Sequence, residues 1–327
     1  MKEEKIPSLT EKIRIFALGG LDEDGKNLFC VEVDQSIYVI EAGIKFPDNK
    51  ESLGIEFIIQ DFTYLVENKD RVAAIFITHG HDDVMGALPY LLKQVPCDVY
   101  TAPLAVKEVQ KMIRQEHISG VRVHSVKRNE KKRIGKRRIV FFPITHAYPG
   151  TFGLAIQTDQ GYIVYSGEFI EDYDDLEDAY RADFTTISEI GNEGVLALLQ
   201  ESKGAERSGH TSPNHRIAPK LLQVLETHEQ KRVFVSVYNQ SVYRIQEIID
   251  CCMASHRKIV FYSKELRELV ERLKDIGYEV DPTLVVDPQD FDNSMKDVVV
   301  IISGQGKSLF KTCLLYTSPS PRDRSVS

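Results

Sequence analysis

The chain has 327 residues, 42% of them hydrophobic and 28% charged, which is typical of a folded globular protein and excludes wholesale disorder. Its 41 basic and 49 acidic residues give a net charge of −8, which excludes a globally basic nucleic-acid coat protein but permits a local basic patch. No apolar run reaches the roughly 18 residues that a membrane-spanning helix needs, so no membrane partner is expected. The charged N-terminal segment lacks the apolar core of a signal peptide, and the five cysteines show no CxxC spacing, so we expect a cytoplasmic protein.

Alternation of apolar and polar residues predicts a strand-rich first part of the chain. The run at 72–77 is wholly apolar and of strand length, which is typical of a buried strand. Helical spacing of apolar residues predicts helices at 87–94 and 105–116. The remaining expected strands are 12–18, two within 27–41, 121–126, 138–142, 154–158 and 162–165.

The pattern changes near residue 200, where strands begin to alternate with helices, as expected of a parallel sheet covered by helices. The expected elements are helix 218–226, strand 232–237, helix 243–252, strand 258–261, helix 264–276 and strand 297–302. The Ser/Pro-rich stretch 312–327 follows abruptly, and we interpret it as a non-native tail. A native disordered tail is the alternative.

The clearest chemical signal is the segment Thr78-His79-Gly80-His81-Asp82-Asp83, directly after the apolar strand. In an extended loop, residues two apart point to the same side, so His79, His81 and Asp83 can converge on one point. Two imidazoles and a carboxylate suit Zn²⁺ or Mn²⁺. The alternative is that these polar residues only cap the end of a strand.

Two further candidates follow other predicted strands. His146 comes after strand 138–142, and Glu168 comes after strand 162–165. Alone, each would more often be an ordinary surface residue. Active sites of layered α/β folds assemble at the carboxyl ends of strands, so the shared placement favours one common site.

Several segments resemble the ribonuclease J family in order and spacing, over about residues 12–310. They are ALGGLDEDGKN, VIEAGIKFP, IFITHGHDDVMGALPYLL, THAYPGTFG, VYSGEF and GVLALLQESKGAE. The resemblance implies an α/β fold in which residues 1–200 form a metallo-β-lactamase αββα sandwich and 201–311 an inserted, incomplete β-CASP domain. It also implies two metal ions, 5′-to-3′ exonuclease and endonuclease action on RNA, and a role in bacterial RNA processing and decay.

By this resemblance, His79, His81 and His146 would bind one metal ion. Asp83 would bind the second ion and orient the attacking water, as the catalytic residue, and Glu168 would bridge both ions. Such ions lower the pKa of bound water and stabilise charge at the phosphodiester.

The chain departs from the family pattern at several positions. Val84 stands where the family has a second-metal histidine, and valine has no lone pair to donate. Glu168, Glu41 and Glu201 each stand where the family has aspartate. Metal geometry tolerates only about 0.2 Å, so an added methylene requires adjustment of the backbone. The family's last metal-ligating histidine and its phosphate-binding segment would follow residue 312.

These departures favour a weakly active or inactive RNA-binding paralogue that partners an active ribonuclease J, as a homo- or hetero-oligomer at full length. An active two-metal ribonuclease is the first alternative. A small-molecule metallo-hydrolase on the same scaffold is the second, since fold does not fix function.

Two further regions are candidates for RNA contact. Residues 127–138 hold eight basic residues in twelve, including Lys131, Lys132 and Arg133, which would contact phosphates in a salt-sensitive way. A solvated hairpin is the alternative. Asn239 and Ser241 lie where a strand gives way to a helix, whose N-terminal amides can hold phosphate. A plain helix cap is the alternative for Ser241.

Overall fold

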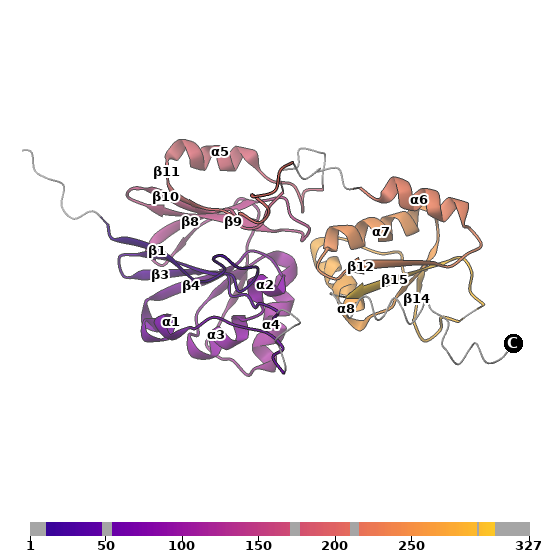
Figure 1. Ribbon diagram of the computed structural model, residues 1–327, viewed down its shortest axis with the longest axis horizontal. Helices are drawn as coiled ribbons and strands as arrows, with labels where there is room; N and C mark the ends of the chain where they lie inside the picture. The colour runs from indigo at the N-terminus through magenta and orange to yellow at the C-terminus, as the bar shows by residue number, and fades with distance from the viewer. Residues whose placement is uncertain (1–10, 48–53, 171–176, 210–215, 293, 305–327) are drawn as a thin grey trace, which may run out of the picture. The chain divides into compact units, whose positions relative to one another are not determined.

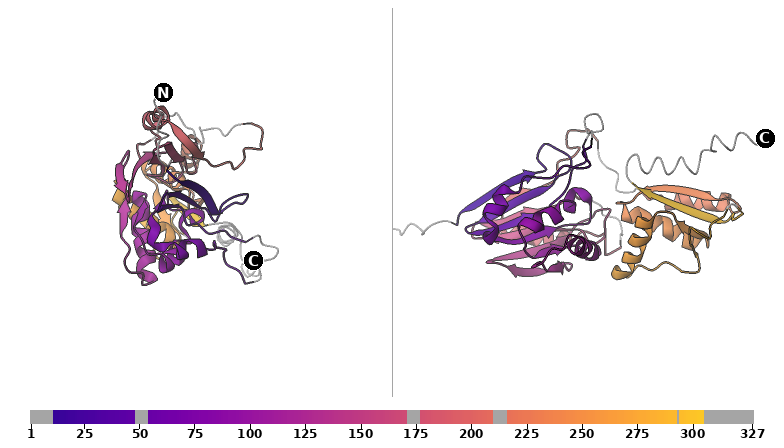
Figure 2. Two further views of the ribbon diagram at one scale, coloured as in Figure 1. Left: turned by 90° about the vertical axis from the view of Figure 1, so that its left-hand side faces the viewer. Right: turned by 90° about the horizontal axis from the view of Figure 1, so that it is seen from below.

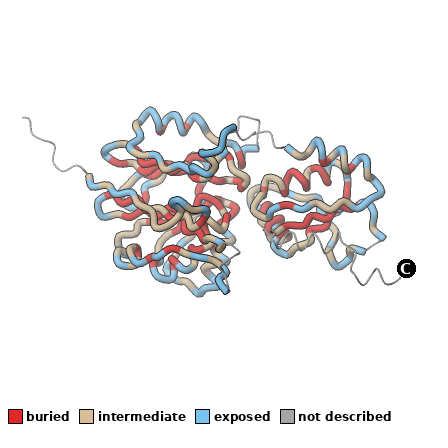
Figure 3. The backbone as a smooth tube through the Cα atoms, in the orientation of Figure 1, coloured by how far each residue is buried: buried red, intermediate tan, exposed pale blue. Residues whose placement is uncertain are grey.

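The computed structural model describes residues 11–47, 54–170, 177–209, 216–292 and 294–304. The predicted tail 312–327 lies outside these residues. The chain divides into two compact units, Met1–Pro213 and Asn214–Ser327, which are drawn in Figure 1. Each unit has its own sheets and its own buried core (Figure 3).

The first unit contains two sheets. In the first sheet β1 to β3 are antiparallel, and β3 to β6 run parallel. Its strands, in spatial order, are β1 (Ile13–Gly19), β2 (Leu28–Val33), β3 (Ser36–Ile40), β4 (Val72–Ile77), β5 (Val99–Thr101) and β6 (Val123–Ser125). The second sheet is antiparallel apart from its β10–β11 pair. Its order is β11 (Val195–Leu199), β10 (Gly161–Tyr165), β9 (Phe152–Thr158), β8 (Arg137–Pro143) and β7 (Lys131–Ile134).

Helices cover the outer face of each sheet, so the layers run helix, sheet, sheet, helix (Figures 1 and 2). The first sheet carries α1 (Thr63–Glu67), α2 (Asp82–Met85), α3 (Leu88–Gln94) and α4 (Val106–Gln115), with short 3-10 turns at Lys69–Arg71 and Pro103–Ala105. The second carries α5 (Phe184–Glu193). The predicted αββα sandwich is therefore confirmed.

Strand alternation explains this layering. On β4, Ile75 and Ile77 belong to the hydrophobic cluster under the helices. Phe76 points the other way, and its ring centroid lies 5.8 Å from that of Phe141 on β8. Successive strand residues face opposite sides of a sheet. One wholly apolar strand can therefore pack against the helices on one side and against the second sheet on the other. Burying a large apolar side chain contributes roughly 1.5–3 kcal/mol to folding stability. The buried side chains of β4 therefore fix the position at which the following residues begin.

The second unit is a parallel sheet with helices, as the sequence predicted. Its strands, in spatial order, are β12 (Val233–Tyr238), β15 (Val298–Gly304), β13 (Lys258–Phe261) and β14 (Val285–Val286). The helices are α6 (Ala218–Thr227), α7 (Val242–Ala254) and α8 (Lys264–Leu273), and a 3-10 turn follows at Lys274–Ile276. No helix among the described residues of either unit has both the length and the apolar character to cross a membrane.

Some elements were not predicted. They are α1, α2, α5, β5, β11 and β14. Most are too short for a periodic pattern to emerge, and α5 contains threonine, glycine and asparagine, which are poor helix formers. Its start is instead fixed by Asp183, whose carboxylate accepts hydrogen bonds from the amides of Thr185 and Thr186.

Candidate metal centre

Three strand ends bring the predicted ligands together. His79 and His81 follow β4, His146 follows β8, and Glu168 follows β10. Each of these residues offers one ligand atom, and these four atoms lie within 4.8 Å of one another. The expected convergence at the carboxyl ends of the strands is thus present in the structure.

The distances suit a compact metal site. His79 Nε2 lies 4.0 Å from Glu168 Oε2, and His146 Nε2 lies 3.7 Å from the same oxygen. Ligand atoms around a tetrahedral zinc ion are roughly 3.4 Å apart, given metal–ligand bonds of about 2.1 Å. The two histidine–glutamate pairs would reach that spacing if they closed by roughly 0.6 and 0.3 Å.

Close backbone approach holds the ligand loop in place. Ala42 N donates to Val84 O at 2.7 Å, and Ile44 N donates to Asp82 O at 2.8 Å. A Cβ on Gly43 between them would lie 1.5 Å from the carbonyl oxygen of Asp83, so only glycine fits there. The segment after β3 is thereby tied directly to the residues after β4.

A buried hydrogen-bond chain orients His79. Thr78 Oγ1 donates to Glu41 Oε1 at 2.6 Å and lies 2.9 Å from His79 Nδ1. Because the hydroxyl has one proton and gives it to Glu41, His79 Nδ1–H donates to the hydroxyl oxygen. The lone pair then sits on Nε2, the nitrogen nearer Glu168. Support of this kind fixes the tautomer of a metal-binding histidine.

The imidazole rings of His79 and His146 are in the neutral form that binds a metal ion. His79 Nε2, which faces Glu168, is buried and has no hydrogen-bond partner among the described residues. Burial holds the pKa of His79 well below its usual range and lowers the pKa of His146 to about 3. Neutral rings and an orphaned Nε2 on His79 fit a metal ion, because an unpaired buried polar atom is otherwise costly.

Asp83 lies in a helix rather than in the extended loop that the sequence predicted. It belongs to α2, which begins at Asp82. It lies outside the group of four but hydrogen-bonds the Glu168 carboxyl. Burial and, after it, the neighbouring Asp83 carboxylate raise the pKa of Glu168 to about 9. Such crowding of carboxyls is relieved when a cation is present.

Val84 is part of the hydrophobic core. Its side chain is 1% exposed and belongs to the cluster beneath the first sheet, together with Met85 and Leu88. The position at which the family resemblance expects a second-metal ligand is therefore apolar and packed. Glu41 and Glu201, the other departures, lie close enough to raise the pKa of Glu168.

A pocket of about 460 Å³ opens beside Glu168 and is lined by residues 20–25, 27, 165, 167–168, 200–204 and 206–207. Lys203 Nζ bonds both carboxylate oxygens of Asp24 at 2.8 and 2.9 Å across this pocket's rim. Asn27 Nδ2 approaches Glu168 Oε1 at 3.5 Å. The sequence did not single out Lys203, Asn27 or Thr78 as site residues, because no spacing rule links them to the H-x-H-x-D segment.

The basic residues lie away from the cluster. Lys131, Lys132 and Arg133 form β7, whose hairpin partner β8 leads from its turn toward His146. Lys131 lies opposite Val140 and Arg133 opposite Arg138, so at about 3.3 Å per residue they lie roughly 10–17 Å along the strand from its end at Pro143. Lys131 pairs with Glu189 at 3.6 Å, and Lys132 with Glu130 at 3.8 Å.

Asn239 and Ser241 lie at the carboxyl end of β12 in the second unit. Ser241 is the N-cap residue of α7, but its side chain makes no capping hydrogen bond. Asn239 Oδ1 is buried and has no hydrogen-bond partner among the described residues.

Comparison with known proteins identifies the family to which this architecture belongs. A model of the β-lactamase superfamily domain matches residues 47–233, and a model of the ribonuclease J β-CASP domain matches residues 230–312. The chain belongs to the ribonuclease J family. Metal dependence is the rule of the metallo-β-lactamase fold, which agrees with the histidine–glutamate cluster.

Curated relatives include proteins named Ribonuclease J 2. The chain is 33% identical to that of Staphylococcus epidermidis RP62A and 34% identical to that of Staphylococcus aureus NCTC 8325, each over 91% of this chain. It spans about half (53%) of the length of these relatives. A crystal structure of a protein of unknown function from Enterococcus faecalis V583 shares the fold, with a TM-score of 0.62, 15% identity, and coverage of 90% of this chain and 78% of that one.

Proposed function

We propose that the protein is an RNA-binding member of the ribonuclease J family with one retained metal site and weak or absent nuclease activity. The observation that carries this proposal is the contrast between the three clustered histidines and the nearby Val84. His79, His81 and His146 converge at one point, and burial lowers the pKa of His79 and His146, whereas Val84 is buried in the core. One ligand set is complete, and the other lacks a donor.

The retained site would hold Zn²⁺ or Mn²⁺ through the three histidines and Glu168. A bound ion would supply a water of lowered pKa next to the scissile phosphate. Asp83, which hydrogen-bonds Glu168, would accept a proton from that water and orient it. The missing second ion would leave the leaving-group oxygen without charge stabilisation, which supports weak turnover.

RNA contact would involve both units. Lys131, Lys132 and Arg133 would contact backbone phosphates away from the metal centre, because they lie roughly 10–17 Å along β8 from its end at Pro143. Asn239 and Ser241 would contact RNA from the start of α7, where the unpaired Asn239 Oδ1 and the uncapped helix amides support a polar contact.

The proposed domains are a metallo-β-lactamase-like part, 1–200, and a β-CASP-like part, 201–311.

Weak activity on its own favours a role beside an active paralogue, as a subunit of a hetero-oligomer that contributes RNA binding. Mixing the full chain with an active ribonuclease J and measuring the mass of the assembly by light scattering tests this role. A complex is expected, and two separate species would contradict it.

The activity itself is tested with 5′-monophosphorylated RNA in the presence of Mn²⁺ or Zn²⁺. Binding with little or no hydrolysis is expected. The variant His146→Ala provides the control, because any residual turnover that depends on this site should vanish in it. Rapid turnover by the unmodified chain would favour an active two-metal ribonuclease instead.

A further inference from the structure

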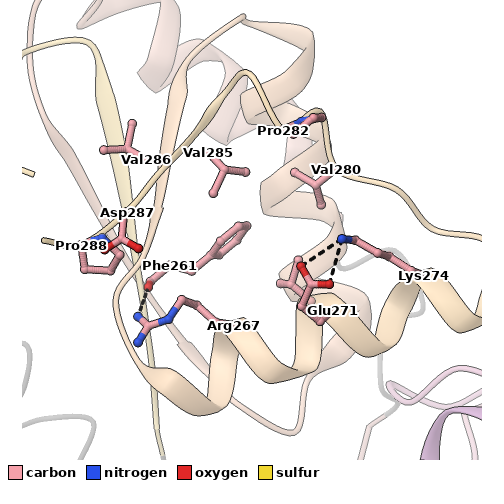
Figure 4. Close-up of a pocket in the computed structure, with 11 residues that line it drawn as sticks. Phe261, Arg267, Glu271, Lys274, Val280, Pro282, Val285, Val286, Asp287 and Pro288 are labelled. Carbon is pink, nitrogen blue, oxygen red and sulfur yellow. Dashed lines mark hydrogen bonds and ion pairs between the residues drawn. The ribbon is translucent and has the colours of Figure 1, made fainter. Parts of the chain in front are cut away.

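A separate pocket of about 460 Å³ lies within the second unit, at the free edge of its sheet (Figure 4). Its walls come from one face of α8, the end of β13, the short edge strand β14 and the segment around it. The volume falls within the range of small-molecule sites. Its lining residues are Phe261, Arg267, Val270, Glu271, Lys274, Val280, Pro282, Val285, Val286, Asp287 and Pro288.

Most of the pocket surface is apolar. The Phe261 ring projects between Val280 and Val285 in Figure 4, and Val270 of α8 also lines the pocket. Phe261 is the last residue of β13, and β14 ends one residue before Asp287, so the pocket lies at the carboxyl ends of two adjacent parallel strands. Open α/β sheets bind their ligands at such ends.

One end of the pocket carries a fixed, unpaired positive charge. Arg267 Nη1 donates to the carbonyl oxygens of Phe261 and Tyr262 at 2.9 and 3.1 Å, which fixes the guanidinium in place. Within the part of the chain that the structure describes, no carboxylate lies within 4.0 Å of Arg267. Its Nη2 and Nε groups form no hydrogen bonds with these residues.

Asp287 lies at the same end of the pocket (Figure 4). Its carboxylate accepts one hydrogen bond, from Gln289 N at 2.9 Å, and it forms no ion pair with a described residue. The two other charged residues of the rim neutralise each other, because Lys274 Nζ donates to both carboxylate oxygens of Glu271 at 2.8 and 2.9 Å. Among the residues that the structure describes, the pocket therefore has one cation, Arg267, and one anion, Asp287, without an ion-pair partner at one end of an apolar slot.

We infer that this pocket binds a guanine base, with Asp287 and Arg267 reading its edge. A planar ring suits the slot beside Phe261, since aromatic stacking stabilises bases on protein side chains. Guanine presents two acceptors side by side, O6 and N7, which match an arginine fork. Next to them lie two donors, N1–H and the N2 amino group, which match the two oxygens of a carboxylate. Adenine, cytosine and uracil lack this pairing of two acceptors with two donors.

The inference goes beyond the proposed metal centre and does not depend on it. It is tested by isothermal titration of the full chain with guanosine, inosine and adenosine. Guanosine is expected to bind at least about tenfold more tightly than adenosine, the preference that one bidentate contact provides. Inosine, which lacks the N2 amino group, is expected to fall between them.

Matched carboxylate variants locate the contact. Asp287→Asn should lose roughly tenfold in guanosine affinity, whereas Glu271→Gln, on the same rim but paired with Lys274, should retain it. Circular dichroism confirms that both variants fold. Equal binding of guanosine and adenosine, no binding of guanosine, or an unchanged affinity in a folded Asp287→Asn variant would each overturn the inference.

A second titration distinguishes a guanine base within RNA from the base of a free nucleotide. Oligouridylate with one internal guanosine is compared with guanosine monophosphate. Tighter binding of the oligonucleotide supports recognition of RNA, and tighter binding of the mononucleotide supports recognition of a free nucleotide. Metal content, measured in parallel, should be the same in Asp287→Asn and the unmodified chain, so failure of the metal-centre proposal would be seen separately.

Discussion

Asp83 and Val84 are neighbours in α2, yet their side chains belong to different environments. The Asp83 carboxyl hydrogen-bonds Glu168 at the metal cluster, whereas the Val84 side chain is packed in the hydrophobic cluster beneath the first sheet. The boundary between the polar centre and the apolar core therefore passes between two consecutive residues. A substitution at Val84 therefore tests whether this helix can contribute a ligand to a second metal ion.

The first prediction concerns this boundary. Val84→His places an imidazole in the apolar cluster and should lower the free energy of unfolding of the metal-free chain by about 1–3 kcal/mol. Zn²⁺ should recover part of that loss, and the double variant Val84→His with Glu168→Asp should take up more metal than the unmodified chain. Val84→Thr is the control, because it adds a polar group without a ligand nitrogen. Urea unfolding with and without Zn²⁺ measures the effect.

The second prediction concerns the hydrogen-bond chain from Glu41 through Thr78 to His79. Thr78→Val removes the hydroxyl but keeps the shape, so His79 loses the contact that fixes its tautomer. Metal affinity should fall about 10–100-fold. Thr78→Ser retains the hydroxyl and should stay close to the unmodified chain. Competition with a chelating dye measures both affinities, and equal affinities in the two variants would refute the role of Thr78.

The third prediction concerns protons released on metal binding. Glu168 has a pKa of about 9 in the metal-free chain and is therefore protonated at pH 7. A metal ion binds the carboxylate, so binding near neutral pH should release about one proton from this residue. Calorimetry in buffers of different ionisation enthalpy counts the protons. Glu168→Gln, which has no proton to lose, should release fewer.

The fourth prediction concerns stability against pH without metal. The pKa of His146 is lowered from 6.5 to about 3, so the unfolded chain binds more protons in that window and stability rises as pH rises through it. The pKa values of Glu41 and Glu168 are raised from 4.5 to about 8 and 9, so the folded chain holds those protons and stability falls with rising pH above 4.5.

These opposite slopes imply a maximum of stability between about pH 4.5 and 6.5 in the metal-free chain. Urea midpoints at several pH values locate it. Glu168→Gln should weaken the decline above pH 4.5, and a decline of unchanged slope would contradict this assignment.

The fifth prediction concerns the basic hairpin. Replacing Lys131, Lys132 and Arg133 by alanine should reduce the slope of log affinity for RNA against log salt by up to about two, given about 0.7 per phosphate contact. The matched control replaces three basic residues of α4, Lys107, Lys111 and Arg114. An equal change of slope in both variants would show a nonspecific charge effect rather than a contact at β7.

Sequence reasoning succeeded where local pattern and geometry coincide. The apolar run of β4 and the H-x-H-x-D segment that follows it predicted the position of His79 and His81, because the sheet fixes where a strand ends. It predicted an extended loop through Asp83, whereas a helix begins at Asp82. The helix start depends on hydrogen bonds to Ala42 and Ile44, which are distant in the sequence.

The supporting residues could not be predicted for the same reason. Thr78 contacts Glu41 across 37 positions of the chain, and Asn27 approaches Glu168 across 141. No spacing rule connects such residues, and only the packed sheets bring them together. Similarly, Arg267 and Asp287 lie in unremarkable segments, and their shared pocket emerges only from the arrangement of α8 and β14.

The central claim is that the chain retains one metal site and has lost the other. Elemental mass spectrometry of the full chain, after equilibration with Zn²⁺ and removal of loosely bound metal, tests it most directly. We predict close to one zinc ion per chain, and close to none in His146→Ala. Close to two ions per chain would contradict the account, because it would show that the second site is complete without a ligand at Val84.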